Sequence, residues 1–482
     1  MRRILTLFLI LCLWAPWTAV RAETFVVNVG GGDEQEYSAL LLRDDGTALT
    51  PLGEYAEITP LTPAGTAEAD RRYAVQPASL AVDLESRDSD TLSYWEFYRV
   101  ALMDGGGNLL TGFDNCGLKG MVNGSITFEA PVSGGVLSGV MDRDGHVLIP
   151  PKYSSISYLG EDRWLALLRE GSDDRYDVVL VDAEGTEYPT GLHTYYSFLP
   201  EQLSSPCPLD NVEEVGGRTV YLAPSGKLAF YRSYEQARFF NGSLAPVVEE
   251  GKYGLIDGKG QLVVPAIYDY IYSNDELDQK VLAAEKGSTL FLFDNTTGEE
   301  LLRRDFAPAD YISVNLSIPG MLWVSAGDTL YALSPDGTEL GAFQGGENLS
   351  YQAVSCNPDA IRVLEIAGES PDDRVRLLDG QGKPLCATYE NIYEQLWRDG
   401  AGRYICARQP VVGSSPESSG WQRWRYGVID ENGRELLPPV YLDGIQALSP
   451  DRYWVKTPER SGMIDSAGKW YYTIENYDYL MD

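Results

Sequence analysis

The fold is decided by a stretch that recurs along the chain, and its clearest copy, residues 253–271, reads YGLIDGKGQLVVPAIYDYI. Residues 426–441 read YGVIDENGRELLPPVY, and residues 139–153 read GVMDRDGHVLIPPKY. Each copy contains a short apolar strand, an Asp-x-x-Gly turn and a second apolar strand that runs into Pro and Tyr. Three such matches indicate an internal repeat, which is the first feature to establish in any fold prediction.

The turn of this repeat has a physical reason for both of its defining residues. An Asp at the first position accepts hydrogen bonds from backbone amides that follow it, and a Gly at the fourth position takes the left-handed conformation that closes a bulged hairpin. We therefore interpret both residues as architectural. They are Asp142 and Gly145, Asp182 and Gly185, Asp257 and Gly260, Asp379 and Gly382, Asp430 and Gly433, and Asp465 and Gly468.

Weaker copies keep the turn glycine, and the whole series defines a period. Its glycines are Gly46, Gly107, Gly145, Gly185, Gly226, Gly260, Gly298, Gly337, Gly382, Gly433 and Gly468. Their spacing is about 40 residues, which is the size of a propeller blade with three or four short strands. Helical periodicity is nearly absent. The sequence predicts an all-β repeat protein of about ten to eleven propeller-like units, in one large or two smaller propellers, with an open β-solenoid or superhelix as the alternative.

Three segments bear on how the units are arranged. Two propellers would meet at a seam near residues 241–252. Residues 24–29 form a spare strand at the start of the chain, and closure of the array by this strand would protect exposed strand edges. The long spacing before Gly433 is explained by a loop insertion at about residues 408–424.

At the repeated residues the chain resembles the WG-repeat family of bacterial proteins. The Trp of that family is replaced by Tyr253 and Tyr426, and Ser138 stands there in a weaker copy. Residues 290–301 and 330–340 are similar to the repeats of quinoprotein-like propellers. The WG-repeat resemblance implies an all-β array, often extracellular, with no shared enzymatic activity and no catalytic residues.

The N-terminus predicts export. Arg2 and Arg3 precede an apolar run, and small residues flank Arg21, as in a signal peptide that spans residues 1–22 and leaves a repeat array at residues 23–482. The run is shorter than the roughly 20 residues that cross a bilayer, so no membrane insertion is expected after cleavage. We expect an extracellular or cell-surface protein, and a monomer. Its net charge of −33 repels phosphate backbones, which argues against a nucleic-acid partner.

Histidine and cysteine offer little catalytic or metal chemistry. Because the chain has only His146 and His193, a multi-histidine metal centre is excluded within one molecule, and a Ser-His-Asp triad would need one of these two. We predict no catalytic residue, no metal ligand and no cofactor. The five cysteines after residue 22 form no CxxC pair. Two states are compatible with the sequence: a disulfide bridge between Cys386 and Cys406, or buried thiols.

Aromatic residues are the remaining indication of function. The chain has 31 Tyr and 10 Trp against 13 Phe, an excess of rings with a polar atom that suits glycan or peptide contact. We assign the tyrosines of the repeat to the core. The candidate ligand contacts lie outside the repeat frame: Tyr195, Tyr196, Trp397, Trp421 and Trp424.

We therefore expect a secreted or cell-surface scaffold without catalysis that binds a protein or glycan ligand. A secreted, glycosidase-like hydrolase is one alternative, because such an enzyme needs only two carboxylates across a cleft and the chain has 71 acidic residues. A purely structural envelope component is the other.

Overall fold

The computed structural model shows an all-β chain, and it describes residues 23–29, 38–63, 65–78, 99–132, 135–169, 171, 174–196, 199, 203, 206–272, 280–307, 312–316, 321–354, 361–368, 374–389, 391–395, 403–408 and 425–475. The predicted signal peptide at residues 1–22 lies outside these residues, as do most of the predicted loop insertion and Cys356.

The strands group into eleven consecutive units, each with one of the turn glycines. Unit 1 contains β1 (Thr24–Val29) and β2 (Ser38–Arg43); unit 2 contains β3 (Tyr55–Pro60), the 3-10 turn η1 (Glu68–Asp70), β4 (Arg72–Pro77) and β5 (Ala101–Asp104). Unit 3 contains β6 (Gly117–Leu118), β7 (Ser125–Val132), β8 (Gly135–Asp142) and β9 (Val147–Tyr153). Unit 4 contains β10 (Ser155–Gly160), β11 (Arg163–Arg169), β12 (Tyr176–Asp182) and β13 (Glu187–Thr194). Unit 5 contains β14 (Cys207–Val212), the 3-10 turn η3 (Glu213–Val215) and β15 (Arg218–Leu222).

The second half of the chain continues in the same way. Unit 6 contains β16 (Gln236–Ala237), β17 (Leu244–Glu249), β18 (Lys252–Asp257) and β19 (Leu262–Tyr268); unit 7 contains β20 (Tyr270–Tyr272), β21 (Val281–Lys286), β22 (Thr289–Asp294) and β23 (Glu300–Asp305). Unit 8 contains β24 (Ile312–Asn315), β25 (Leu322–Ala326), β26 (Thr329–Leu333) and β27 (Glu339–Gln344); unit 9 contains β28 (Leu349–Val354), β29 (Arg362–Ala367) and β30 (Arg374–Asp379). Unit 10 contains β31 (Asn391–Gln395), β32 (Arg403–Arg408), β33 (Arg425–Asp430) and the start of β34 (Glu435–Ser449), and unit 11 contains the rest of β34 with β35 (Arg452–Lys456), β36 (Arg460–Ile464) and β37 (Trp470–Glu475).

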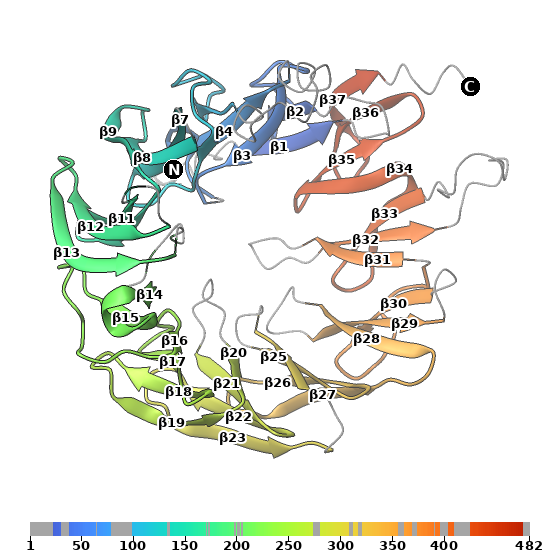
Figure 1. Cartoon of the computed structure of the whole chain (residues 1–482). Helices are drawn as coiled ribbons and strands as arrows, with labels where there is room; N and C mark the ends of the chain where they lie inside the picture. Colours follow the sequence, from blue (N-terminus) through green and yellow to red (C-terminus); the bar gives the residue numbers. More distant parts are fainter. Residues whose placement is uncertain are drawn as a thin grey trace, which may run out of the picture.

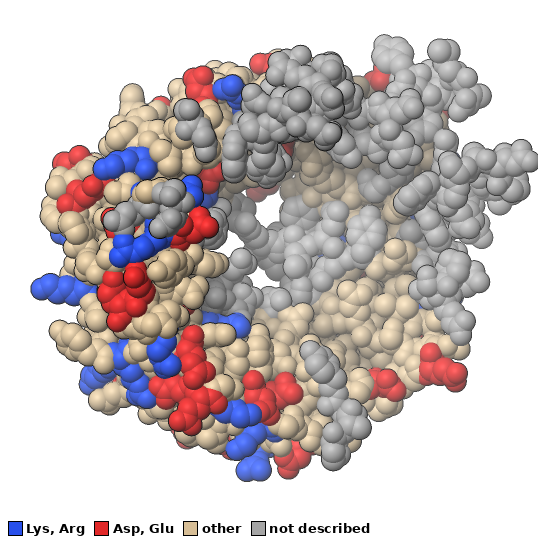
Figure 2. All heavy atoms as spheres, viewed as in Figure 1, with Lys and Arg blue, Asp and Glu red and all other residues tan. Residues whose placement is uncertain are grey.

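The units follow one another around a single ring, in which the first strands of the chain lie beside the last ones (Figure 1). Within each unit the strands pair antiparallel with their neighbours in sequence order. The space-filling view shows an opening at the centre of the ring and, along the left and lower parts of the rim, acidic side chains with basic ones between them (Figure 2). The all-β repeat prediction is therefore confirmed, and the arrangement is one large ring.

The core is divided among the junctions between units. The cluster between units 6 and 7, for example, brings Leu255 and Val264 of one unit against Leu282 and Phe291 of the next. In the described part of the chain there are eleven such clusters, one at each junction of eleven units. An open array of eleven units would have one junction fewer, so the cluster count itself requires a closed ring.

The eleventh cluster joins the two ends of the chain. Phe25 and Val27 of β1 pack with Trp454 and Met463 of unit 11. The Gln446 side chain donates a hydrogen bond to the Val26 carbonyl at 3.0 Å. The spare N-terminal strand thus closes the ring by packing against unit 11. Residues 241–252, where a seam between two propellers was expected, lie inside unit 6 and connect β16, β17 and β18 of one continuous sheet.

The Asp-x-x-Gly turns have local hydrogen bonds that account for their residues. In unit 6 the amides of Lys259 and Gln261 both donate to Asp257 Oδ1 at 2.9 Å, and Gly260 has a φ of 74°. A β-carbon on Gly260 would also lie 2.5 Å from the Phe230 ring of unit 5. The turn glycine therefore serves the hairpin and the junction with the preceding unit at once.

Antiparallel pairing divides the connections between two faces of the ring. In the units with four strands the glycine turns join the third and fourth strands, and we call the face that carries them the turn face. The connections from second to third strand, and from one unit to the next, lie on the other side, which we call the loop face. In units 4 and 5 this face carries the start of β12, the end of β13 and η3.

The cysteines and the repeat tyrosines have defined positions in the ring. Cys386 and Cys406 lie in one hydrophobic cluster between units 9 and 10. The repeat tyrosines Tyr153 and Tyr268 are buried, and Tyr441 is half-buried. Among the described residues, no helix has the length and apolar character of a membrane span.

Candidate functional site

Two of the five predicted ligand contacts can be located. Tyr195 and Tyr196 follow β13 on the loop face, and their exposed fractions are 54% and 48%. Trp397, Trp421 and Trp424 lie outside the described residues. The candidate site therefore lies at the end of β13.

The end of β13 meets the next unit through one pair of residues. Thr194 pairs with Val212, the last residue of β14, and η3 begins immediately afterwards with Glu213. Antiparallel pairing at this point places His193, one residue before Thr194, beside the glutamates of η3. The cluster thus bridges units 4 and 5.

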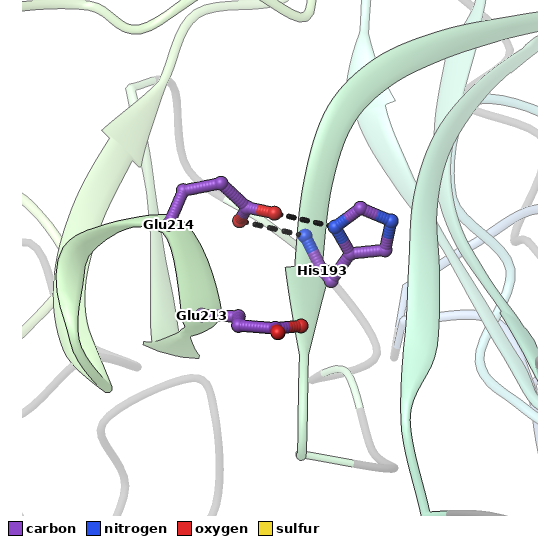
Figure 3. A group of neighbouring side chains, drawn as sticks. All are labelled: His193, Glu213 and Glu214. Carbon is purple, nitrogen blue, oxygen red and sulfur yellow. Dashed lines mark hydrogen bonds and ion pairs between the residues drawn. The ribbon is translucent and has the colours of Figure 1, made fainter.

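His193 and Glu214 make two contacts with each other. The His193 amide donates to one carboxylate oxygen of Glu214 at 3.0 Å, and the ring Nδ1 lies in hydrogen-bond contact with the other oxygen. Figure 3 shows the Glu214 carboxylate pointing at the imidazole, with the Glu213 side chain extending toward the same strand. The His193 side chain is 25% exposed, so solvent still reaches the cluster.

The second nitrogen of His193 also faces a carboxylate. Asp177 lies directly opposite His193 in the β12–β13 register, and its Oδ1 lies 3.0 Å from Nε2. Carboxylate oxygens only accept hydrogen bonds when ionised, so each of these two contacts needs a proton or another cation between nitrogen and oxygen. An imidazole held between two carboxylates is consequently a site that attracts positive charge.

Glu213 completes the cluster. One of its carboxylate oxygens forms an ion pair with Arg175 Nε at 2.5 Å. One ligand atom each from His193, Glu213 and Glu214 lie within 4.8 Å of one another. These three side chains could hold a metal ion, since an imidazole nitrogen and two carboxylate oxygens are common protein ligands.

The electrostatics of Glu214 reflect its contacts. Burial raises the pKa of this carboxyl group, but hydrogen bonds from the ring and the amide of His193 outweigh burial, and the pKa lies below its ordinary value. Glu214 is thus held as a carboxylate at neutral pH.

The local sequence explains the position of η3. Gly216 ends the 3-10 turn in the left-handed conformation with a φ of 70°, and Gly217 follows with a φ of 77°. Two consecutive glycines can turn the chain back into β15 without steric cost, which leaves Glu213 and Glu214 at the tip of the connection.

Sequence reasoning missed this cluster for a physical reason. No catalytic or metal-binding motif surrounds His193 in the sequence, and its partners are distant from it along the chain, in β12 and η3. The Glu-Glu-Val-Gly-Gly stretch, an acidic pair before a glycine turn, is the one local signal that could have drawn attention to η3. His146 is different: it is 79% exposed on the turn face, and its ring lies 3.0 Å from Asp142, the aspartate of its own turn.

Comparison with known proteins bears on the repeat. The family described as "WG containing repeat" matches residues 139–170, 224–253, 253–276 and 426–456. Three of these stretches include the three copies that the sequence analysis identified, and the fourth begins in the turn of unit 5. No curated protein matches the sequence.

Solved structures were compared as well. A crystal structure of a eukaryotic initiation factor is 10% identical, with a TM-score of 0.38, over 79% of this chain and 95% of that chain. The crystal structure of BamB from Moraxella catarrhalis is also 10% identical, with a TM-score of 0.26, over 71% of this chain and 93% of that one.

The four matched stretches fall in units that share the turn, the strand pairing and the junction contacts described above. This chain is therefore an all-β repeat protein that carries WG repeats.

Proposed function

We propose that this protein is an exported, non-catalytic binding scaffold that acts outside the cell or at its surface and holds a protein or glycan ligand. The observation that carries the proposal is the contrast between two sets of tyrosines. Tyr153 and Tyr268, which recur in the repeat, are buried between units, whereas Tyr195 and Tyr196 are exposed where the repeat is interrupted.

An exposed tyrosine pair suits contact with a ligand. Each ring offers a flat apolar area with a hydroxyl group at one end, and it loses little conformational entropy when bound because it has only two side-chain torsions. Thr194 supports this position, since its hydroxyl accepts a hydrogen bond from the Tyr196 amide at 3.0 Å and donates one to the Asp210 carbonyl at 2.7 Å. The pair therefore stands on a well-anchored strand end.

Charge narrows the class of ligand. The net charge of −33 and the carboxylates of Asp177, Glu213 and Glu214 around His193, two residues before Tyr195, disfavour anionic partners. A basic protein surface or an uncharged glycan meets no such repulsion. We take these two ligand classes as the candidates.

The use of the recurrent aspartates supports a scaffold rather than a hydrolase. Asp142, Asp257 and Asp430 each accept two backbone amides within their own turns. Such carboxylates are committed to hairpin closure and are poorly suited to serve as a catalytic acid or base.

The experiment is a binding measurement with a matched control. Purified mature protein would be applied to a glycan array and used to capture basic proteins from the producer's envelope fraction. We expect a Tyr195→Ala/Tyr196→Ala variant to lose at least tenfold in affinity, and a variant with Tyr231→Ala, whose side chain is 98% exposed, to keep it. Equal affinity of all three proteins would reject the site, and release of sugars from envelope polymers by the purified protein would reject a non-catalytic role.

A further inference from the structure

We propose that His193, Glu213 and Glu214 bind a divalent transition-metal ion of the Zn²⁺ type at the junction of units 4 and 5. This site stands independently of the proposed function, because it rests on side-chain geometry and requires no particular ligand on the neighbouring tyrosines.

The donor set fits such an ion. One imidazole nitrogen and two carboxylate oxygens within 4.8 Å of one another can converge on a common point by small rotations of the two glutamates, whose side chains are 41% and 34% exposed. Three protein ligands with one position left to solvent is the pattern of open Zn²⁺ sites. Calcium and magnesium are disfavoured, because they prefer oxygen ligands alone and calcium needs six to eight of them.

Asp177 provides a second feature expected of a metal-binding histidine. Such a histidine commonly donates its other ring N–H to a carboxylate, which fixes the tautomer and orients the ring. Asp177 Oδ1 lies 3.0 Å from Nε2, on the side away from η3. With a proton on Nε2, the lone pair of Nδ1 is directed at the Glu214 carboxylate, and a metal ion between these two acceptors satisfies both.

The charges also favour a cation. Asp177, Glu213 and Glu214 contribute three negative charges, and Arg175 supplies one positive charge through its ion pair with Glu213. Because His193 belongs to unit 4 and the glutamates to unit 5, a bound ion would link two neighbouring units. Metal binding is therefore expected to raise the melting temperature of the ring as well.

The test is titration of the chelator-treated full-length mature protein with ZnCl₂ by isothermal calorimetry. We expect one Zn²⁺ per chain, and a loss of affinity of at least tenfold in His193→Ala and in Glu213→Gln/Glu214→Gln. For Asp177→Asn we expect a loss of about 10- to 100-fold, the usual effect of removing the carboxylate behind a histidine ligand. CaCl₂ should give no comparable heat.

His146→Ala is the matched control, because it removes the only other histidine, which also contacts an aspartate but lies on the turn face. This variant should bind Zn²⁺ like the wild type. Equal binding by His193→Ala and His146→Ala, or no binding by the wild type, would overturn the proposal.

A measurement on the unaltered protein protects the test against misfolded variants. In a nuclear magnetic resonance spectrum of protein labelled at histidine, the two histidines give two sets of ring signals. The spectrum of His146→Ala shows which set belongs to which histidine. Zn²⁺ should shift the His193 set and leave the His146 set unchanged; the opposite result, or no shift, would refute the site. Since no other ligand is present in these experiments, their failure would leave the tyrosine-dependent binding test unaffected.

Discussion

The main-chain carbonyl of Tyr471, in the last unit, packs so closely against Gly46, in the first unit, that a β-carbon on Gly46 would lie 2.7 Å from the carbonyl carbon. In the same way, a β-carbon on Gly107 would meet the main-chain carbonyl of Leu49, and one on Gly433 would meet that of Leu385, at junctions inside the ring. The closure between the two ends of the chain is therefore equivalent to the other junctions and needs no special interface.

This contact predicts that Gly46→Ala destabilises the closure. Gly46 has a φ of 88°, and Gly53 has a similar φ of 80° but nothing within 4 Å of its missing β-carbon. Gly53→Ala should therefore lower the free energy of unfolding by about 1 kcal/mol from backbone strain alone, and Gly46→Ala by about 2 to 4 kcal/mol because steric overlap is added. Denaturant titration of both variants measures the difference, and equal losses would contradict the closure.

A second glycine of the repeat is required by strand packing rather than by its own φ. A β-carbon on Gly254 would lie 2.8 Å from the Val264 carbonyl oxygen and from the Ala266 amide nitrogen, at a point where the β18–β19 register shifts. Gly427 has the same relation to Leu437 and Pro439 in unit 10.

We predict that Gly254→Ala lowers the free energy of unfolding by about 2 kcal/mol, because the neighbouring strand must move away. Gly258→Ala, at the second position of the following turn and with nothing within 4 Å of its β-carbon, is the control and should cost less than about 0.5 kcal/mol. Thermal denaturation followed by circular dichroism compares the two. A Gly254 variant as stable as the Gly258 variant would show that the bulge adapts to a side chain.

Glu187 links units 3 and 4 through a buried tyrosine. Its Oε1 accepts hydrogen bonds from the Tyr153 hydroxyl at 2.6 Å and from Lys152 Nζ at 2.7 Å. Lys152 and Tyr153 accordingly hold the pKa of Glu187 below its ordinary value.

We expect Glu187→Gln to cost about 1 to 2 kcal/mol, because a hydrogen bond to a charged acceptor is replaced by a neutral one. A double-mutant cycle with Tyr153→Phe should give a coupling energy of about 1 kcal/mol. Strictly additive effects would mean that the tyrosine hydroxyl contributes nothing through Glu187.

Asp269 makes stability depend on pH in a defined direction. Hydrogen bonds from Lys252 Nζ at 2.5 Å and from the Gly287 amide at 2.7 Å lower the pKa of this carboxyl group. A group with a lowered pKa in the folded state stabilises the protein above its unfolded pKa, near 3.9, and loses that contribution as the pH falls through the folded value.

Asp269→Asn should therefore be less stable than the wild type at pH 7, and the difference should shrink as the pH falls from about 4 to 2. Urea midpoints of both proteins between pH 7 and pH 2 test this expectation. A difference that is constant over the whole range would show that the charge of Asp269 plays no part. The turn aspartates Asp142 and Asp465 also have lowered pKa values, because hydrogen bonds from turn amides outweigh burial, so the wild type itself should become less stable in acid.

Much of the fold follows from interactions within a few residues of sequence. The turn at Asp257 and Gly260 is fixed by hydrogen bonds that reach only four residues, and the strands on either side are short, apolar and β-branched. Such local features are readable in the sequence, and their period of about 40 residues gives the unit size. Tyr195 and Tyr196 were also identifiable as aromatic residues outside the repeat frame.

The sequence by itself determined the all-β class, the repeat, its turns and the candidate tyrosines, because these depend on local backbone geometry and on residue chemistry. Only the tertiary structure decided that eleven units form one ring, since that depends on the small rotation accumulated from unit to unit, which ends with Tyr471 against Gly46. Only the tertiary structure, too, placed Asp177, Glu213 and Glu214 around His193, because strand pairing within unit 4 and across the junction to unit 5 brings together residues that no sequence spacing connects.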